Sequence, residues 1–150
     1  MIISDSTFLQ MRTFLITQFT KKYDCIIGLK RGGLIPAVYF SHALETPMYV
    51  ADVTHSLSKG DNLGWHDGAL PTIEPGKNIL IVDDILDSGY TVEECAKHYL
   101  GTCNVDIAVL VTKTSALLKC EQLTPNVYHA MEIPDDSPFV YFPWETKPGE

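Results

Sequence analysis

Hydrophobic positions along the chain form two patterns, short and mainly apolar runs and longer stretches with one apolar face. Runs rich in Ile and Val are typical of strands that are buried on both faces of a parallel sheet. Such runs occupy residues 23–29, 47–53, 78–84, 105–112 and 127–133. Helical stretches separate several of these runs. The alternation predicts an α/β fold in which helices flank a central, mostly parallel sheet.

The segment before the first strand is predicted to be an amphipathic helix. Residues 4–20 begin near Ser4 and Ser6, either of which suits an N-cap. A second helix is expected over 34–44, where Pro36 suits a first turn. The apolar residues of the first helix recur at helical spacing and are expected to cover the sheet: Phe8, Met11, Leu15, Ile16 and Phe19.

Chemistry concentrates where the run at 78–84 ends. Residues 79–91 read ILIVDDILDSGYT, so the predicted strand ends in two carboxylates, Asp83 and Asp84. The ends of such strands are where α/β proteins bind ligands. A third acid, Asp87, opens a short loop of small and hydroxyl residues: Ser88, Gly89, Tyr90 and Thr91.

The loop after the acids predicts an anion site. Gly89 lets the backbone turn sharply or approach a ligand closely. Thr91 and Glu94 fit a capping box, which predicts a helix over 91–100. Backbone N–H groups at the start of that helix can hold a phosphate. Carboxylates beside a phosphate would repel it. They would rather accept hydrogen bonds from sugar hydroxyls, or hold a Mg²⁺ ion that in turn binds the phosphate.

A second loop follows the run at 23–29. It carries two cations, Lys30 and Arg31, and then two glycines, Gly32 and Gly33. The glycines free backbone N–H groups beside the positive charges, so a polyphosphate is the ligand that this loop predicts.

Residues 79–91 resemble the 5-phosphoribosyl 1-pyrophosphate (PRPP) signature of the type I phosphoribosyltransferases. The resemblance implies that Asp83 and Asp84 bind the ribose hydroxyls and the shell of a Mg²⁺ ion. It implies that residues 87–91 bind the 5′-phosphate, with Asp87 also accepting a proton from the base. The stretch 29–37 is similar to the family's pyrophosphate loop, with Lys30 where the xanthine–guanine branch has Ser. A strained, cis peptide between Lys30 and Arg31 is therefore expected.

The resemblance also implies a base site. Lys113 ends a predicted strand, and in 6-oxopurine phosphoribosyltransferases a Lys at this place donates to O6 of the purine. Residues 126–150 look like the family's small C-terminal hood, and residues 54–75 like its mobile lid. By position, Phe139 would stack on the purine although many relatives have Trp there. The Val140 backbone would read the ring, and Glu145 would lie near the exocyclic substituent.

Bulk properties narrow the function classes. A length of 150 residues is that of one domain, and the net charge of −8 argues against nonspecific nucleic-acid binding. The cysteines are widely spaced without a CxxC pair, which predicts reduced thiols in a cytoplasmic protein. No signal peptide or membrane-spanning stretch is recognisable.

The resulting hypothesis is a purine salvage enzyme. It would transfer the phosphoribosyl group from PRPP to hypoxanthine, guanine or xanthine, giving the nucleoside monophosphate and pyrophosphate. The family usually forms homo-oligomers, dimers or tetramers. One rival is a PRPP-sensing regulator without turnover, which would need a basic surface or an appended domain. A pyrimidine acceptor is disfavoured by the hood. A generic nucleotide-binding domain is disfavoured because GxxxxGK[ST] and GxGxxG are both absent.

Overall fold

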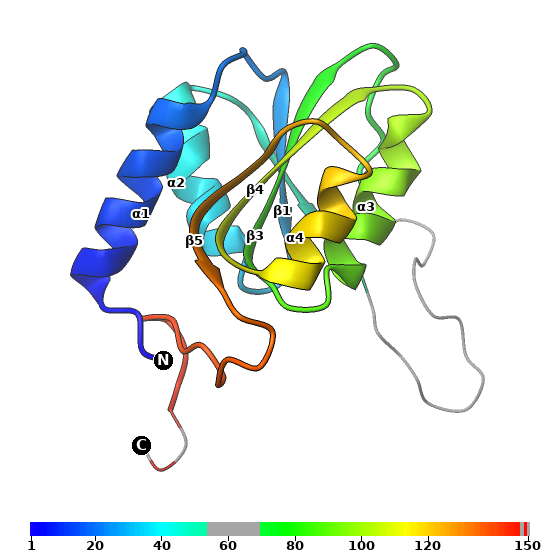
Figure 1. Cartoon of the computed structure of the whole chain (residues 1–150). Helices are drawn as coiled ribbons and strands as arrows, with labels where there is room; N and C mark the ends of the chain where they lie inside the picture. The colour runs from blue at the N-terminus through cyan, green and yellow to red at the C-terminus, as the bar shows by residue number, and fades with distance from the viewer. Residues whose placement is uncertain (54–69, 148, 150) are drawn as a thin grey trace.

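The computed structural model describes residues 1–53, 70–147 and 149. Its centre is a sheet in the order β2-β1-β3-β4-β5, and every pairing between neighbouring strands is parallel. Figure 1 shows helices on both faces of this sheet. The elements follow the chain as α1 (Asp5–Gln18), β1 (Cys25–Leu29), α2 (Leu34–Leu44), β2 (Met48–Ala51), β3 (Asn78–Leu86), α3 (Tyr90–Leu100), β4 (Asn104–Lys113), α4 (Thr114–Glu121) and β5 (Val127–Ile133). The predicted α/β class is confirmed.

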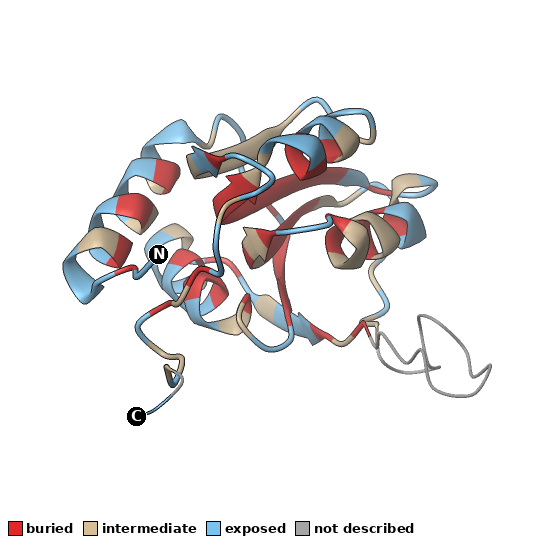
Figure 2. Ribbon diagram, turned by 60° about the horizontal axis from the view of Figure 1, so that its bottom comes forward, coloured by how far each residue is buried: buried red, intermediate tan, exposed pale blue. Residues whose placement is uncertain are grey.

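Alternating side chains of the strands build two hydrophobic cores. Leu80 and Val82 of β3 pack with α1 and α2, whereas Ile79 and Ile81 pack with α3 and α4. Successive side chains of a strand point to opposite faces, so a strand covered on both faces is apolar throughout. Figure 2 shows the buried residues running along the strands and the inner sides of the helices.

The helix starts confirm one prediction and correct another. Ser4 is the N-cap of α1, and its Oγ accepts a hydrogen bond from the Thr7 N–H at 3.1 Å. The expected capping box at Thr91 is wrong, because α3 begins one residue earlier and its N-cap is Gly89. Gly89 has φ of 78°, a left-handed conformation that glycine adopts without strain.

Helix α4 was not predicted. It has eight residues and buries only three side chains, those of Ala116, Leu117 and Cys120. So short an apolar stripe has little helical periodicity for sequence reasoning to detect. The helix nonetheless connects Lys113, at the end of β4, to the strand that follows.

Two predictions fall partly outside the described residues. The lid was expected over 54–75, and residues 54–69 are not described. In the described remainder, Leu70 and Ile73 pack against the core on the α3 side, and the Tyr99 hydroxyl donates to the Pro71 carbonyl. The strand at Val127–Ile133 belongs to the sheet, so the segment that could form a hood is narrower than 126–150 and starts after Ile133.

The remaining expectations concern thiols and membranes. All four cysteines are free and buried, namely Cys25, Cys95, Cys103 and Cys120. Burial raises the pKa of the Cys25 thiol to about 11, so it stays protonated at neutral pH. No helix within the described residues is long and apolar enough to cross a lipid bilayer.

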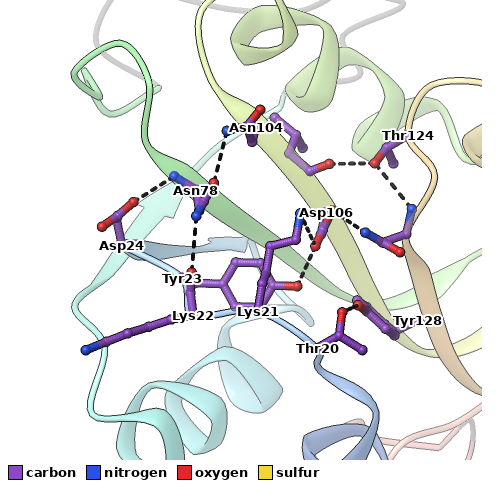
Figure 3. A network of polar contacts seen from close by, with 12 residues as sticks. Thr20, Lys21, Lys22, Tyr23, Asp24, Asn78, Asn104, Asp106, Thr124 and Tyr128 are labelled. Atoms are coloured by element: carbon purple, nitrogen blue, oxygen red, sulfur yellow. Dashed lines mark hydrogen bonds and ion pairs between the residues drawn. The ribbon is translucent and has the colours of Figure 1, made fainter.

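A polar network closes the sheet at the edge where the strands begin (Figure 3). The buried Asp106 carboxylate accepts hydrogen bonds from the Tyr23 hydroxyl at 2.6 Å and the Asn126 side chain at 3.3 Å. The Lys21 ammonium lies 3.3 Å from the same carboxylate. A buried charge needs such partners, and this network fixes the start of β1 against β4 and β5. Burial, together with Asp106, raises the pKa of Tyr23 far above its ordinary value.

Replacing Tyr23 by Phe should destabilise the fold without touching the opposite edge. The change leaves the Asp106 carboxylate short of one donor, and a lost hydrogen bond to a buried charge costs about 1.5–3 kcal/mol. Urea unfolding would measure this loss in free energy. Tyr49→Phe is the matched control, because Tyr49 is an exposed tyrosine on the edge strand β2, which two strands separate from β4 and Asp106. Equal losses in the two variants would contradict the role given to Asp106.

Candidate active site

Because the strands are parallel, their carboxyl ends meet at one edge of the sheet, and the predicted site residues gather there. Asp83 and Asp84 are the last acids of β3, and their side chains point to opposite sides of the sheet. Asp83 lines a cavity beside the start of α3, whereas Asp84 lines cavities on the opposite side of the sheet. The Asp84 N–H donates to Asp83 Oδ1 at 2.9 Å, and the Ile85 N–H donates to Asp84 Oδ1 at 2.8 Å.

The acid pair is electrostatically costly. Burial and then the neighbouring Asp84 charge raise the pKa of the Asp83 carboxyl well above its ordinary value. Burial likewise raises the pKa of Asp84, although hydrogen bonds from Asp83 and the Ile85 backbone oppose the shift. Two adjacent carboxylates with few donors form a place where a cation would relieve repulsion.

The predicted phosphate loop forms the second part of the site. A cavity lies between the end of β3 and the first turn of α3. The Ser88 hydroxyl accepts a hydrogen bond from the Tyr90 N–H at 3.2 Å, which shapes the turn before the helix. The positive end of the α3 dipole faces this cavity, as an anion site requires. Every predicted member of the loop lines it: Asp87, Ser88, Gly89, Tyr90 and Thr91.

The second predicted loop follows β1 and touches β3 directly. The peptide between Lys30 and Arg31 is cis, as expected. A Cβ on Gly33 would lie 2.5 Å from the Val82 carbonyl oxygen and 2.8 Å from that of Leu29, so no side chain fits there. A Cβ on Gly32 would overlap the Asp84 carboxylate. The loop and the acid strand therefore meet backbone to backbone.

The two cations of this loop take different directions. Arg31 lines a cavity together with Gly32, Asp84 and Glu145. Lys30 instead lies 3.7 Å from Asp52, in an exposed ion pair beyond the end of β2. Of the two cations, Arg31 alone therefore lines the cavity to which Asp84 contributes.

A further cavity of about 170 Å³ lies between the end of β4 and the C-terminal segment. Lys113 is the last residue of β4, and its Nζ lies 2.5 Å from Asp87 Oδ1. A partly buried ammonium and an exposed carboxylate thus form one pair at the wall of the cavity. The cavity also contains every predicted base-site residue, and its full lining is Asp84, Ile85, Asp87, Lys113, Ser137, Pro138, Phe139, Val140, Phe142 and Glu145.

Residues 134–147, which we call the hood segment, cover this cavity. The Phe139 side chain is 65% exposed, whereas Val140 is buried against the core on the α1 side. Glu145 Oε2 accepts a hydrogen bond from the Phe142 N–H at 2.8 Å, which holds the carboxylate at the cavity. The Phe142 ring stacks on Trp144 with centroids 5.0 Å apart. These contacts make the segment a packed part of the structure.

Several lining residues were missed by the sequence reasoning. Ile85, Ser137 and Phe142 contribute to the base-side cavity, and none has a chemical signature of its own. Ile85 lies between the predicted acids, so its strand position is the only signal that could have identified it. Phe142 belongs to the C-terminal segment that was recognised, in which roles at the base were predicted for Phe139, Val140 and Glu145 but not for Phe142.

The acid pair also fits the metal that the resemblance implies. Mg²⁺ is usually held by one or two carboxylates, and substrate phosphates and water complete its shell. The described residues contain no group of three or more His, Cys, Asp or Glu side chains that could hold an ion alone. Asp83 and Asp84, with raised pKa values, suit a cation that arrives with an anionic substrate.

Comparisons with known proteins identify the fold. The phosphoribosyl transferase domain matches residues 12–147. A purine phosphoribosyltransferase from Pyrococcus horikoshii superposes with a TM-score of 0.73 at 26% identity, covering 98% of this chain and 94% of that one. A xanthine–guanine phosphoribosyltransferase from Cereibacter sphaeroides is 26% identical over 132 residues, which are 82% of this chain and 70% of that protein.

Other relatives have different names. The transcriptional regulator GfcR from Methanococcus maripaludis strain C5 is 29% identical over 98 residues, 64% of this chain and 47% of the regulator. The chain thus spans about half the length of that relative. Adenine phosphoribosyltransferases are also among the similar proteins. The family match nevertheless runs from α1 to the end of the hood segment and includes both predicted anion loops, so the chain belongs to the phosphoribosyl transferase domain family, as a type I phosphoribosyltransferase of the purine branch.

Proposed function

We propose that the enzyme transfers the 5-phosphoribosyl group of PRPP to a 6-oxopurine, namely hypoxanthine, guanine or xanthine, with Mg²⁺ as cofactor. The observation that supports this proposal is the Lys113–Asp87 pair at the base-side cavity. A 6-oxopurine presents a carbonyl oxygen at C6 beside a proton at N7. An ammonium next to a carboxylate offers one donor and one acceptor for those neighbouring groups.

The rest of PRPP would extend along the sheet edge. Its 5′-phosphate would bind residues 87–91 at the start of α3, and its ribose hydroxyls would meet Asp83 and Asp84. Its pyrophosphate would lie at Arg31, Gly32 and Gly33, with Lys30 adding charge at the margin. The cavities along the acids, the α3 turn and the Arg31 loop support this path.

The base would be held by the hood segment. The exposed Phe139 ring is available to stack on the purine face, and the backbone of Val140 would read the ring. Glu145, fixed by the Phe142 N–H, would lie near the substituent at C2. Lys113 has only donors, so it would favour an oxygen over an amino group at C6.

The chemistry exchanges one bond at C1 of the ribose. The bond from C1 to the pyrophosphate oxygen breaks, and its electron pair leaves with pyrophosphate. N9 of the base forms the new bond, while the N7 proton passes to Asp87. Bound Mg²⁺ supplies positive charge that stabilises the departing pyrophosphate. Arg31 and the loop N–H groups add donors for that charge, and Lys113 with Phe139 holds the base in line with C1.

A second candidate function is a PRPP-binding regulator without turnover, favoured by the similarity to GfcR. One assay separates the two. Purified protein with PRPP and Mg²⁺ is incubated with hypoxanthine, guanine, xanthine or adenine, and nucleotide and pyrophosphate are quantified. We expect equal amounts of both products with at least one 6-oxopurine and far less with adenine. Tight PRPP binding without products would instead support the regulator.

Replacing Lys113 by Gln should weaken use of the preferred 6-oxopurine. The neutral amide cannot provide a charged hydrogen bond to O6, and the loss of about 1.5–3 kcal/mol corresponds to a roughly 10- to 100-fold lower kcat/KM for the base. Steady-state kinetics with each purine would measure it. Lys77→Gln is the control, since Lys77 is exposed and pairs with Glu74 away from the site. If the Lys113 variant keeps the wild-type preference among the purine bases, Lys113 does not bind the substituent at C6.

We also propose that the protein forms homo-oligomers, in line with the expectation from its family. Exposed apolar side chains on α2 and the edge strand β2 support this: Ile35, Val38, Tyr39, Tyr49 and Val50. Subunit interfaces of homodimers are more apolar than the rest of a protein surface. Light scattering coupled to size-exclusion chromatography would give the mass in solution.

A further inference from the structure

The hood segment is tied to the first turn of α4 by one carboxylate. Asp135 Oδ1 accepts hydrogen bonds from the Ser115 N–H at 3.0 Å and from the Ser115 hydroxyl at 2.9 Å. These bonds, first the one from the backbone, lower the pKa of Asp135, and the charge of Lys113 acts in the same direction. Asp135 is therefore ionised at neutral pH and close enough to feel the Lys113 charge.

The place where this tie is made matters for the base site. Lys113 is the N-cap of α4, and Ser115 follows it by two residues. A carboxylate that binds the first turn of a helix satisfies N–H groups that have no partner within the helix. Asp135 thus joins the start of the hood segment to the backbone that carries Lys113.

The far end of the same stretch has its own anchor. The Ile3 N–H donates to the Tyr141 carbonyl at 2.8 Å, and the Tyr141 N–H donates to the Met1 carbonyl at 2.9 Å. Figure 1 shows the N-terminal residues beside the C-terminal segment. Residues 136–140, which we call the roof, therefore span two anchor points, and they include lining residues from Ser137 to Val140.

We propose that Asp135 is a positioning residue that sets the distance between the roof and Lys113, and thereby the affinity for the purine base. This inference deepens the proposed function. The roof has a turn at its start, closed by a hydrogen bond from the Ser137 N–H to the Pro134 carbonyl at 3.1 Å. Two further bonds hold the neighbouring backbone, from the Thr114 hydroxyl to the Ile133 carbonyl at 3.5 Å and from the N-terminal ammonium to the Phe139 carbonyl at 2.9 Å. Without Asp135 the turn itself loses its bonds to the first turn of α4, so the roof is less firmly held over the cavity.

The adjacent acid provides a matched control. Asp136 is exposed, and within the described part of the chain no hydrogen bond or ion pair is made by its side chain. Asp135→Ala and Asp136→Ala therefore remove the same charge from the same turn, and only the first removes the anchor. Asp135→Asn keeps an acceptor oxygen and should restore most of the wild-type behaviour.

The kinetic test compares base and PRPP constants separately. For Asp135→Ala we expect KM for the purine to rise by about fivefold to tenfold, because the variant loses the charge-assisted hydrogen bonds that hold the roof. We expect kcat and KM for PRPP to stay within about twofold, because the phosphate loops are untouched. Equal KM for the purine in the two alanine variants would overturn the proposal, as would parallel increases in both KM values.

Hydrogen–deuterium exchange without ligands tests the anchor independently of turnover. Roof amides should exchange faster in Asp135→Ala than in Asp136→Ala, with the sheet unchanged. If wild type converts no purine, the proposed function fails, and faster roof exchange would still support the anchor. Identical exchange in the two variants would overturn the anchor even in a fully active enzyme.

Discussion

Replacing Asp87 by Asn should reduce kcat by about 10²- to 10⁴-fold, the usual contribution of a general base. Asn has nearly the same shape, so the loop at the start of α3 keeps its form, but an amide cannot take the N7 proton. The substitution also removes the charge that faces Lys113 at 2.5 Å. The ammonium would then lack its carboxylate partner while the base is bound.

Binding and turnover must be measured apart to interpret this variant. Calorimetric titration with PRPP should show an affinity within about tenfold of wild type, since the loop N–H groups and hydroxyls remain. Pre-steady-state mixing would show whether the chemical step itself is slow. A kcat close to that of the wild type would mean that another group or the solvent, and not Asp87, accepts the N7 proton of the base.

Replacing Asp83 by Asn should make the protein more stable and less active. The pKa of this carboxyl is raised in the folded state above its ordinary 3.8. Between these two values the folded protein binds more protons than the unfolded chain does, so stability falls as the pH rises through that window. At neutral pH the ionised Asp83 carboxylate therefore destabilises the folded protein most. An amide removes the charge and can still accept the Asp84 N–H.

Thermal unfolding at several pH values checks this sign. We expect the Asn variant to unfold at a higher temperature than wild type at pH 7.5, by about 2–4 °C for each kcal/mol gained. The difference should shrink toward pH 4. Activity should drop by about tenfold or more, because a ligand for the cation is lost. Asp136→Asn, on the exposed turn, should change neither property. A less stable Asp83 variant would contradict the electrostatic account.

Local sequence was sufficient to identify the two loops that we propose to bind anions. The acids, glycines and hydroxyls of residues 79–91 are contiguous, so their chemistry can be recognised without the fold. The cis peptide at Lys30 was predictable for the same reason. Parallel strands then bring these loops to one edge, which the alternation of runs and helices also implied.

Contacts between distant segments could not be predicted. The pairing of Lys113 with Asp87 depends on how β4 lies beside β3, and the turn of Lys30 toward Asp52 depends on where β2 ends. The tie from Asp135 to Ser115 needed α4, whose eight residues carry too weak a periodicity to be detected. The N-cap of α3 was misassigned because a left-handed Gly89 competes with the hydroxyl signal of Thr91.

The backbone contact at Gly33 has a consequence for protein engineering. The Val82 and Leu29 carbonyls leave no room for a side chain at Gly33. Main-chain contacts therefore fix how the Arg31 loop lies against β3. The base-side cavity is instead lined partly by side chains of a separate, C-terminal segment and partly by residues at the ends of β3 and β4. Under the proposed function, libraries that vary only residues 137–142 would change the lining for the base and leave the loops proposed to bind the sugar phosphate unaltered. Even one added methyl group at Gly33 would disturb the contact between the Arg31 loop and β3.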